Sequence, residues 1–105
     1  MNPGDIYYAY WEYEDCPGSG KNRPVLIIEN SDTIKVICLK MTSNKKIRTE
    51  YDYTLKYWQE SGLRCPTVVR TDKRQDITIS DFRHKIGTIH KFDWVNILRL
   101  IAPFS

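Results

Sequence analysis

The sequence predicts a mainly β, small antiparallel barrel with one helix packed against it near the C-terminal end. Short apolar segments follow one another in the order strand, long loop, strand, tight turn, strand, and this order favours an antiparallel meander. The final segment instead repeats apolar residues at the spacing of a helix. With 105 residues, the chain is expected to form a single domain over 1–105, whose modest core a dimer interface would extend.

Three strands are expected in the first part of the chain. They are apolar or aromatic segments bounded by turn residues, and they span 6–13, 24–29 and 34–41. A loop rich in glycine and proline, over 15–22, joins the first two, and a turn at 30–32 joins the second to the third. Pro24 opens the second strand, where a proline costs no ladder hydrogen bond and holds Arg23 in an extended conformation.

A helical turn and two further strands are expected in the next part. Residues 57–61 are predicted to form one helical turn, which ends at Gly62 because glycine is common just after the last helical residue. The two strands are predicted over 67–70 and 76–79, and the polar segment 71–74 is predicted to be the turn between them.

The terminal segment is predicted to be an amphipathic helix over 92–101, ended by Pro103. Apolar residues recur along one face of this helix. They are Phe92, Val95, Leu98 and Ile101, with Ile97 and Leu100 widening the face.

Composition limits the cellular compartments and the kinds of binding site that are expected. A net charge of +3 and a pI of about 8.8 are compatible with nucleic-acid binding but do not require it. Cys16, Cys38 and Cys65 show no C-x-x-C spacing, so neither a disulfide framework nor a zinc site is indicated, and Cys38 is expected in the core. Neither a secretory signal nor a stretch of ~20 apolar residues is visible, so we expect a cytoplasmic protein without membrane contact, metal or cofactor.

Polar side chains stand at the ends of predicted strands. Arg23 precedes the second strand, Thr42 and Ser43 end the third, and Arg70–Asp72 follows the strand over 67–70. If the second and third strands form a hairpin, Arg23 and Thr42 meet at one edge of the sheet. A fixed cation and a hydroxyl would then lie together. The alternative for Arg23 is a solvated arginine at a strand start.

The sequence contains no obvious protein nucleophile. No motif of a serine hydrolase or of a phosphate-binding loop is present, and His84 and His90 are expected to be surface or capping residues. The economical reaction is one in which RNA supplies its own 2′-OH. Arg23 would then bind the developing phosphorane charge, Thr42 would donate a hydrogen bond to it, and Asp72 would accept a proton.

Arg70 beside Asp72 would make that carboxylate a weaker base, since a nearby cation lowers its pKa. The alternative for Arg70–Asp72 is a turn with an ion pair worth ~0–1 kcal/mol. Both interpretations stay open on the residues alone.

Six segments together resemble the MazF/PemK family of toxin–antitoxin ribonucleases, in that family's order and spacing. They are Gly4–Ile6, Asn22–Ile28, Met41–Ser43, Ser61–Leu63, Val68–Asp72 and Ile86–Gly87. The resemblance implies an SH3-like/CcdB-like barrel, a homodimer, and metal-independent cleavage of single-stranded RNA at short sequences, giving a 2′,3′-cyclic phosphate and a 5′-OH. It also implies neutralisation by a cognate antitoxin whose acidic, flexible tail covers the RNA groove.

Carried over residue by residue, the resemblance assigns catalysis to Arg23, Thr42, Arg70 and Asp72. The loop over 14–21 departs from the family, because it lacks the histidine that some members carry there. Side chains expected to contact RNA phosphates are Ser43, Lys45, Lys46, Arg48, Lys73 and Arg74. Aromatic residues that could stack on bases, although packing is the simpler role for each, are Tyr7, Tyr10, Trp11 and Tyr13.

Two alternatives to a ribonuclease remain. A non-enzymatic poison of the CcdB-like, gyrase-binding kind would act through the C-terminal helix around Trp94. A plain SH3-like binding module would show neither toxicity nor cleavage.

Overall fold

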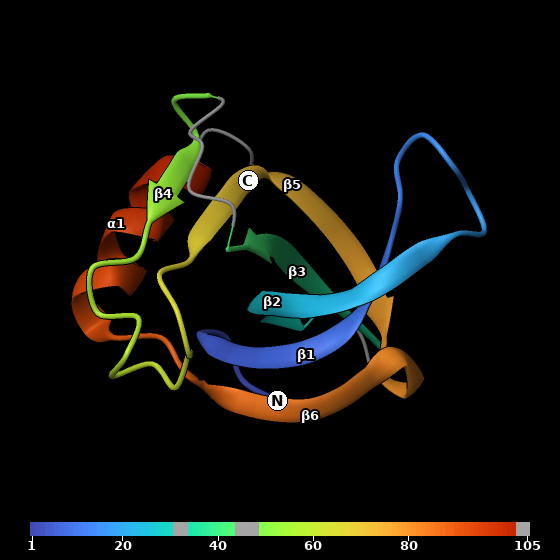
Figure 1. Cartoon of the computed structure of the whole chain (residues 1–105), viewed down its shortest axis with the longest axis horizontal. Coiled ribbons are helices and arrows are strands. Elements are labelled where there is room, and N and C mark those ends of the chain that lie inside the picture. The colour runs from blue at the N-terminus through green and yellow to red at the C-terminus, as the bar shows by residue number, and fades with distance from the viewer. Residues whose placement is uncertain (31–33, 44–48, 103–105) are drawn as a thin grey trace.

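The computed structural model describes residues 1–30, 34–43 and 49–102. Over these ranges the chain forms a six-stranded sheet, a short 3-10 helix and an α-helix (Figure 1). The elements, in chain order, are β1 (Asp5–Glu12), β2 (Gly20–Asn30), β3 (Lys35–Thr42), β4 (Asp52–Thr54), β5 (Val68–Thr78), η1 (Ile79–Asp81), β6 (Phe82–Thr88) and α1 (Lys91–Ile101). The prediction of a mainly β fold with a C-terminal helix is confirmed.

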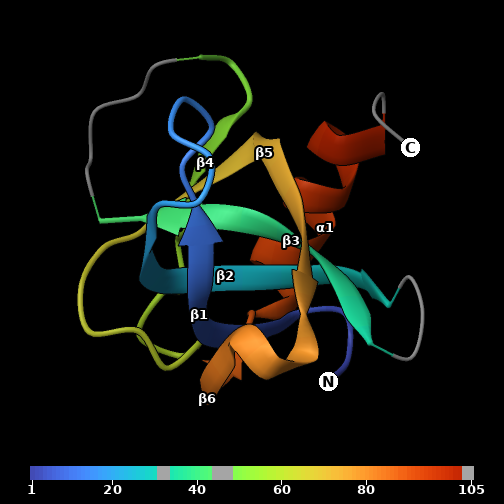
Figure 2. The same cartoon turned by 90° about the vertical axis from the view of Figure 1, so that its right-hand side faces the viewer.

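The sheet has the strand order β4-β5-β3-β2-β1-β6, and each neighbouring pair is antiparallel. The predicted meander of the first three strands is confirmed. The sheet curls, so that β5 passes into β6 through η1 (Figures 1 and 2). In the described ranges the edge strands β4 and β6 do not pair with each other, so hydrogen bonding does not close the sheet into a barrel.

Two hydrophobic clusters lie on opposite faces of the sheet. The first core lies against α1, on the left in Figure 1, and its buried members are Ile6, Leu26, Leu39, Met41, Leu55, Val69, Ile89, Ile97 and Ile101. The buried members of the second core are Ala9, Trp11, Val25, Ile27, Val36, Cys38 and Ile77. Side chains alternate between faces along a strand, which explains why Leu26 joins one core while Val25 and Ile27 join the other.

The predicted start of the second strand is wrong. β2 begins at Gly20 rather than at Pro24, so Arg23 lies inside a strand and not at its entrance. The pairing of β2 with β3 reaches only Val25, whereas Pro24 still pairs with Tyr8 of β1. Pro24 is tolerated because, among the described residues, β2 has a paired neighbour on one side only at this point.

The predicted turn at 71–74 is also wrong. β5 is one strand of 11 residues, not two short strands. Lys40 of β3 pairs with Arg70 whereas Leu39 pairs with Arg74, so the residues between them form a bulge in β5. A bulge places polar residues between two apolar runs and therefore looks like a turn in the sequence.

Three elements were not predicted, namely β4, η1 and β6. β4 has three residues, too few to carry an alternation. The side chains of β6 are exposed or half-buried, so this strand lacks the buried alternate positions that would reveal it.

The predicted helical turn at 57–61 is confirmed. The Leu63 N–H donates to the Trp58 carbonyl at 3.1 Å, and Gly62 adopts φ of 93°, as expected after the last residue of a helical turn. A Cβ at Gly62 would lie 2.6 Å from the Ile86 carbonyl oxygen, and one at Gly87 would lie 2.1 Å from the backbone of the turn. The two glycines thus allow the turn to lie directly on β6.

The terminal helix is confirmed, and the predicted packing face is correct for Ile97 and Ile101 but wrong for three other residues. Side chains predicted to pack are exposed at 46%, 41% and 40%: Phe92, Val95 and Leu98. The buried face is instead spaced by four residues and consists of Asp93, Ile97 and Ile101. Only Asp93 of this face was missed, because a pattern of apolar residues does not reveal a buried carboxylate. No helix in the described ranges is long and apolar enough to span a membrane.

The buried Asp93 carboxylate joins α1 to the segment that follows β4. It accepts hydrogen bonds from the Tyr53 hydroxyl at 2.6 Å, the Lys56 N–H at 3.1 Å and the Tyr57 N–H at 2.9 Å. Burial and the bond to Asp93 raise the pKa of Tyr53. These contacts compensate the desolvation of the carboxylate.

Candidate functional site

Arg23 and Thr42 lie on the second-core face of the sheet, where β2 and β3 are no longer paired. Val25 of β2 and Lys40 of β3 are the last pair between these strands. Arg23 and Thr42 each lie two residues beyond that pair, and side chains two residues apart in a strand point to the same face. Residues opposite each other in antiparallel strands point to the same face, and Val25 belongs to the second core. The predicted hairpin between these strands is confirmed.

Arg70 lies on the same face and forms a buried ion pair. It pairs in register with Lys40 of β3 on one side and with Asp52 of β4 on the other. Its Nη1 donates to Asp52 Oδ2, and the two side chains are 8% and 1% exposed. The ion pair therefore joins neighbouring strands instead of residues of one turn.

Arg23, Lys40 and Arg70 together form a cation cluster. Burial lowers the pKa of Arg23, the positive charge of Arg70 lowers it further, and Tyr13 opposes this effect. Burial likewise lowers the pKa of Lys40, and the charges of Arg23 and Arg70 add to the shift. In the described part of the chain, the buried Arg23 Nε has no hydrogen-bond partner. An anion bound at the cluster would relieve this repulsion and supply acceptors.

The end of β1 and the segment that follows it are joined to β5 beside the cluster. The Gln75 side chain donates to the Glu12 carbonyl at 2.7 Å and accepts from the Glu12 N–H at 3.3 Å. Lys73 Nζ lies 3.3 Å from Glu14 Oε2, and both charges act on the pKa of Lys40. Asp72 is half-buried next to Lys73, in the bulge of β5.

The structure brings only some of the predicted phosphate-contacting residues together. Lys73 lies beside the cation cluster, whereas Arg74 is exposed opposite Leu39. Ser43 is exposed just after β3. Three others lie outside the described residues: Lys45, Lys46 and Arg48.

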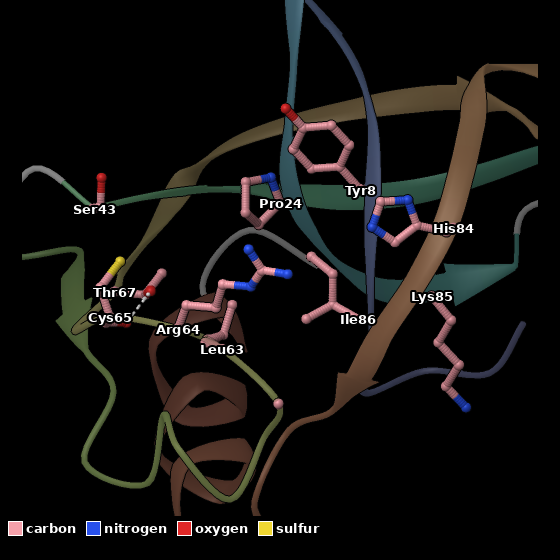
Figure 3. A pocket seen from close by; sticks show the side chains of 11 residues that line it. Tyr8, Pro24, Ser43, Leu63, Arg64, Cys65, Thr67, His84, Lys85 and Ile86 are labelled. Carbon is pink, nitrogen blue, oxygen red and sulfur yellow. Dashed lines mark hydrogen bonds between the residues drawn. The ribbon is translucent and has the colours of Figure 1, made fainter.

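A pocket of about 590 Å³ opens beside Pro24 and Ser43, the residues that directly follow Arg23 and Thr42. Its lining includes Tyr8, Pro24, Ser43, Arg64, Thr67 and His84 (Figure 3). We call it the side pocket. It is built by β1, β2, β6 and the segment between β4 and β5.

The histidines and the core cysteine fit their expected roles. His90 caps α1, since its Nδ1 accepts from the Phe92 N–H at 3.1 Å, and His84 is exposed and stacks on Tyr8. Cys38 is buried, and burial raises the pKa of its thiol to about 12. In 1–30, 34–43 and 49–102, no group of three or more His, Cys, Asp or Glu side chains could hold a metal ion.

Sequence reasoning missed three residues of this region, namely Tyr8, Lys40 and Asp52. Lys40 could have been identified from the sequence, because it is a charged residue within an apolar strand and shares a face with Thr42. Asp52 had none, since it lies 18 residues from Arg70 in a strand that was not predicted.

Solved structures show how widely this fold is shared. An endoribonuclease from a mycobacterial species superposes with a TM-score of 0.75 at 14% identity, covering 98% of this chain and 88% of that one. The Mycobacterium tuberculosis toxin MazF-mt6 gives 0.72 at 21% identity, covering 94% and 93%. A mycobacterial endoribonuclease in complex with its cognate antitoxin gives 0.76 at 15% identity, covering 98% and 92%. At these identities the likeness establishes the fold.

Sequence comparison adds the family. No curated protein matches the chain significantly. The family of PemK-like, MazF-like toxins of type II toxin–antitoxin systems matches residues 2–104, which is nearly the whole chain. The chain therefore belongs to the PemK-like, MazF-like toxins of type II toxin–antitoxin systems.

Proposed function

We propose that the chain is an endoribonuclease that cleaves single-stranded RNA at short sequences without a metal ion. The observation that supports this most is the cation cluster, where Arg23 and Arg70 share a face with the hydroxyl-bearing Thr42. A scissile phosphate needs such a combination of cations and a hydrogen-bond donor. The fold is also that of a mycobacterial endoribonuclease.

In the proposed reaction the RNA 2′-oxygen attacks the adjacent phosphorus, and the bond from phosphorus to the 5′-oxygen breaks. The products are a 2′,3′-cyclic phosphate and a 5′-OH. Arg23 holds the phosphorane oxygens through its planar fork, and Thr42 donates a further hydrogen bond. Arg70, oriented by its ion pair with Asp52, adds a second positive charge that acts on Arg23.

Proton transfer is the second requirement of this reaction. Asp72 takes the proton of the 2′-OH, and Arg23 gives a proton to the departing 5′-oxygen. The lowered pKa of Arg23 supports the donor role, because a weaker base releases its proton more readily. Asp72 is half-buried in the bulge beside Lys73, which keeps it on the strand that carries Arg70.

The test is incubation of purified protein with a long unstructured RNA in EDTA, followed by mapping of the fragment 5′ ends. Cleavage at one short motif is expected, and Arg23→Ala should slow it by about 10²–10³ or more. Arg99→Ala, which removes an exposed arginine from α1, is the matched control and should cleave normally. Intact RNA with the parent chain, or full cleavage by Arg23→Ala, would contradict the proposal.

A cognate antitoxin with an acidic, flexible segment is the proposed protein partner. A related fold is known in complex with its cognate antitoxin, and the cation cluster is complementary to carboxylates. A polyglutamate peptide should compete with RNA for the parent chain at low salt. Binding of both the peptide and the RNA should weaken as the salt concentration rises. Competition that survives in Lys40→Met and Arg23→Ala variants would argue against the cluster as the shared site.

A homodimer is the proposed assembly. Phe92, Val95 and Leu98 form an exposed apolar stripe on α1, and a second copy would cover it. Light scattering should give twice the mass of 12.4 kDa for the parent chain and a monomer for Val95→Glu. A monomeric parent chain would rule the assembly out.

A further inference from the structure

The side pocket is separate from the cation cluster although the two adjoin in the chain. Pro24 follows Arg23 on β2, and neighbouring residues of a strand point to opposite faces. The pairing of Pro24 with Tyr8 likewise places Tyr8 on the face opposite to Arg23. The pocket is thus on the other face of the sheet, but its residues Pro24 and Ser43 directly follow Arg23 and Thr42 in the chain, beyond the last β2–β3 pair at Val25.

One wall of the side pocket is a stacked pair of rings. Tyr8 of β1 and His84 of β6 are register partners, and their ring centroids are 5.4 Å apart with an interplanar angle of 25°. Figure 3 shows both rings at one end of the pocket. A flat π-surface of this kind accepts a planar ring of the ligand by stacking.

The charge of the side pocket is positive. Arg64 is exposed and extends into the pocket (Figure 3), and it forms no ion pair in the described part of the chain. Lys85 differs, because it lies 3.5 Å from Asp5 Oδ1 and points away from the other lining residues. No acidic residue is among the described residues of the lining. Arg64 is thus a guanidinium free to stack on or pair with a ligand.

Hydrogen-bonding groups complete the lining. Ser43 offers an exposed hydroxyl. The Thr67 hydroxyl donates to the Cys65 carbonyl at 2.9 Å (Figure 3), which leaves its lone pairs able to accept. Leu63 and Ile86 supply apolar contact. The combination of a ring stack, an arginine, apolar walls and two hydroxyls matches a nucleobase.

We infer that the side pocket binds a base of the RNA substrate next to the scissile phosphate and so determines the cleavage sequence. The inference rests on the proposed ribonuclease function. An acidic peptide would require cations but would not need the Tyr8–His84 stack, so the lining favours RNA. Tyr8 and Arg64 are thereby assigned to sequence selection, apart from the chemistry at Arg23.

The first test maps cleavage sites with variants of the pocket. Arg64→Ala and Tyr8→Leu should weaken RNA binding about 5- to 100-fold and relax the base preference at one position of the motif. Tyr8→Phe keeps the ring and should leave motif and affinity unchanged. Arg83→Ala is the matched control, since Arg83 is an exposed arginine next to His84 but outside the pocket.

The second test does not depend on activity. Cys65 lines the pocket and is exposed, whereas Cys38 is buried, so Cys16→Ser leaves Cys65 as the reactive thiol. The probe is an RNA of about ten nucleotides, of randomised sequence and with 2′-O-methyl groups throughout. At ten times its Kd, it should slow alkylation of Cys65 by iodoacetamide about tenfold, and this protection should fall in the Arg64→Ala background.

The outcomes separate this inference from the proposed function. Unchanged motif and affinity in Arg64→Ala and Tyr8→Leu, or alkylation of Cys65 unaffected by RNA, would overturn the pocket while leaving the ribonuclease intact. If the pocket variants changed the oligomeric state but not the cleavage motif, the pocket would be a protein interface, and the inference would be overturned. Protection of Cys65 without any cleavage by the parent chain would support the pocket and refute the enzyme.

Discussion

Replacing Asp52 with Asn tests the electrostatic construction of the site. The side chains of Asp52 and Arg70 form an ion pair and are 1% and 8% exposed. The positive charge of Arg23 also repels that of Arg70. Breaking a buried ion pair by removing the charge of one partner typically costs about 3–5 kcal/mol of free energy of unfolding. That is a large share of the roughly 5–15 kcal/mol that stabilises an ordinary domain, and it lowers Tm by about 4–8 °C per kcal/mol.

The assay is urea unfolding followed by fluorescence of the three tryptophans. Asp76→Asn makes the same chemical change at an exposed position of β5 and should alter stability by no more than about 0.5 kcal/mol. The double variant Asp52→Leu/Arg70→Met should recover most of the loss, because neither side then carries a buried charge. A loss from Asp52→Asn no greater than that from Asp76→Asn would refute the reasoning.

Three further predictions concern Asp93, Tyr53 and Lys40. Asp93→Ala leaves three donors without their acceptor and should cost about 3–5 kcal/mol in urea unfolding; a loss below about 1 kcal/mol would contradict the role of the carboxylate. Tyr53→Phe should cost about 1–3 kcal/mol. Because the pKa of Tyr53 is raised above its usual 10.0, the stabilisation from Tyr53 is complete below that pH and is lost as pH rises through the folded pKa. The difference between parent and Tyr53→Phe should therefore shrink in alkaline solution, and a constant difference would exclude this linkage. Lys40→Met should reduce the salt slope of RNA binding by about 0.7, without destabilising the fold, since it removes a repelled charge; an unchanged slope in fluorescence anisotropy would show that Lys40 contacts no phosphate.

Local sequence signals predicted the elements that carry a strong pattern. The aliphatic run after Pro24 and the turn that follows it placed the β2–β3 hairpin, and Gly62 placed the helical turn. The boundaries of β2 and β5 depended on tertiary pairing, because Gly20 pairs with Glu12 of β1 and the bulge in β5 is defined by its register against β3. Neither interaction is visible in a short window of sequence.

The candidate site divides in the same way. The β2–β3 hairpin could be predicted from one turn, and with it the shared face of Arg23 and Thr42. The partner of Arg70 could not be found, because Asp52 lies in a three-residue strand whose pairing depends on the rest of the sheet. The buried face of α1 was predicted at Ile97 and Ile101 but not at Asp93, which takes the position where an apolar residue would ordinarily stand.

The most direct test of the proposed chemistry is an RNA with one altered sugar. In EDTA, the parent chain should cleave an RNA that carries its mapped motif and leave a 2′,3′-cyclic phosphate, detected by mass. The same RNA with a single 2′-deoxy nucleotide immediately before the scissile phosphate should stay intact, because the attacking oxygen is absent. Cleavage of the 2′-deoxy substrate at that bond would show that another nucleophile acts and would contradict the assignment of Arg23 and Thr42 to a 2′-OH attack.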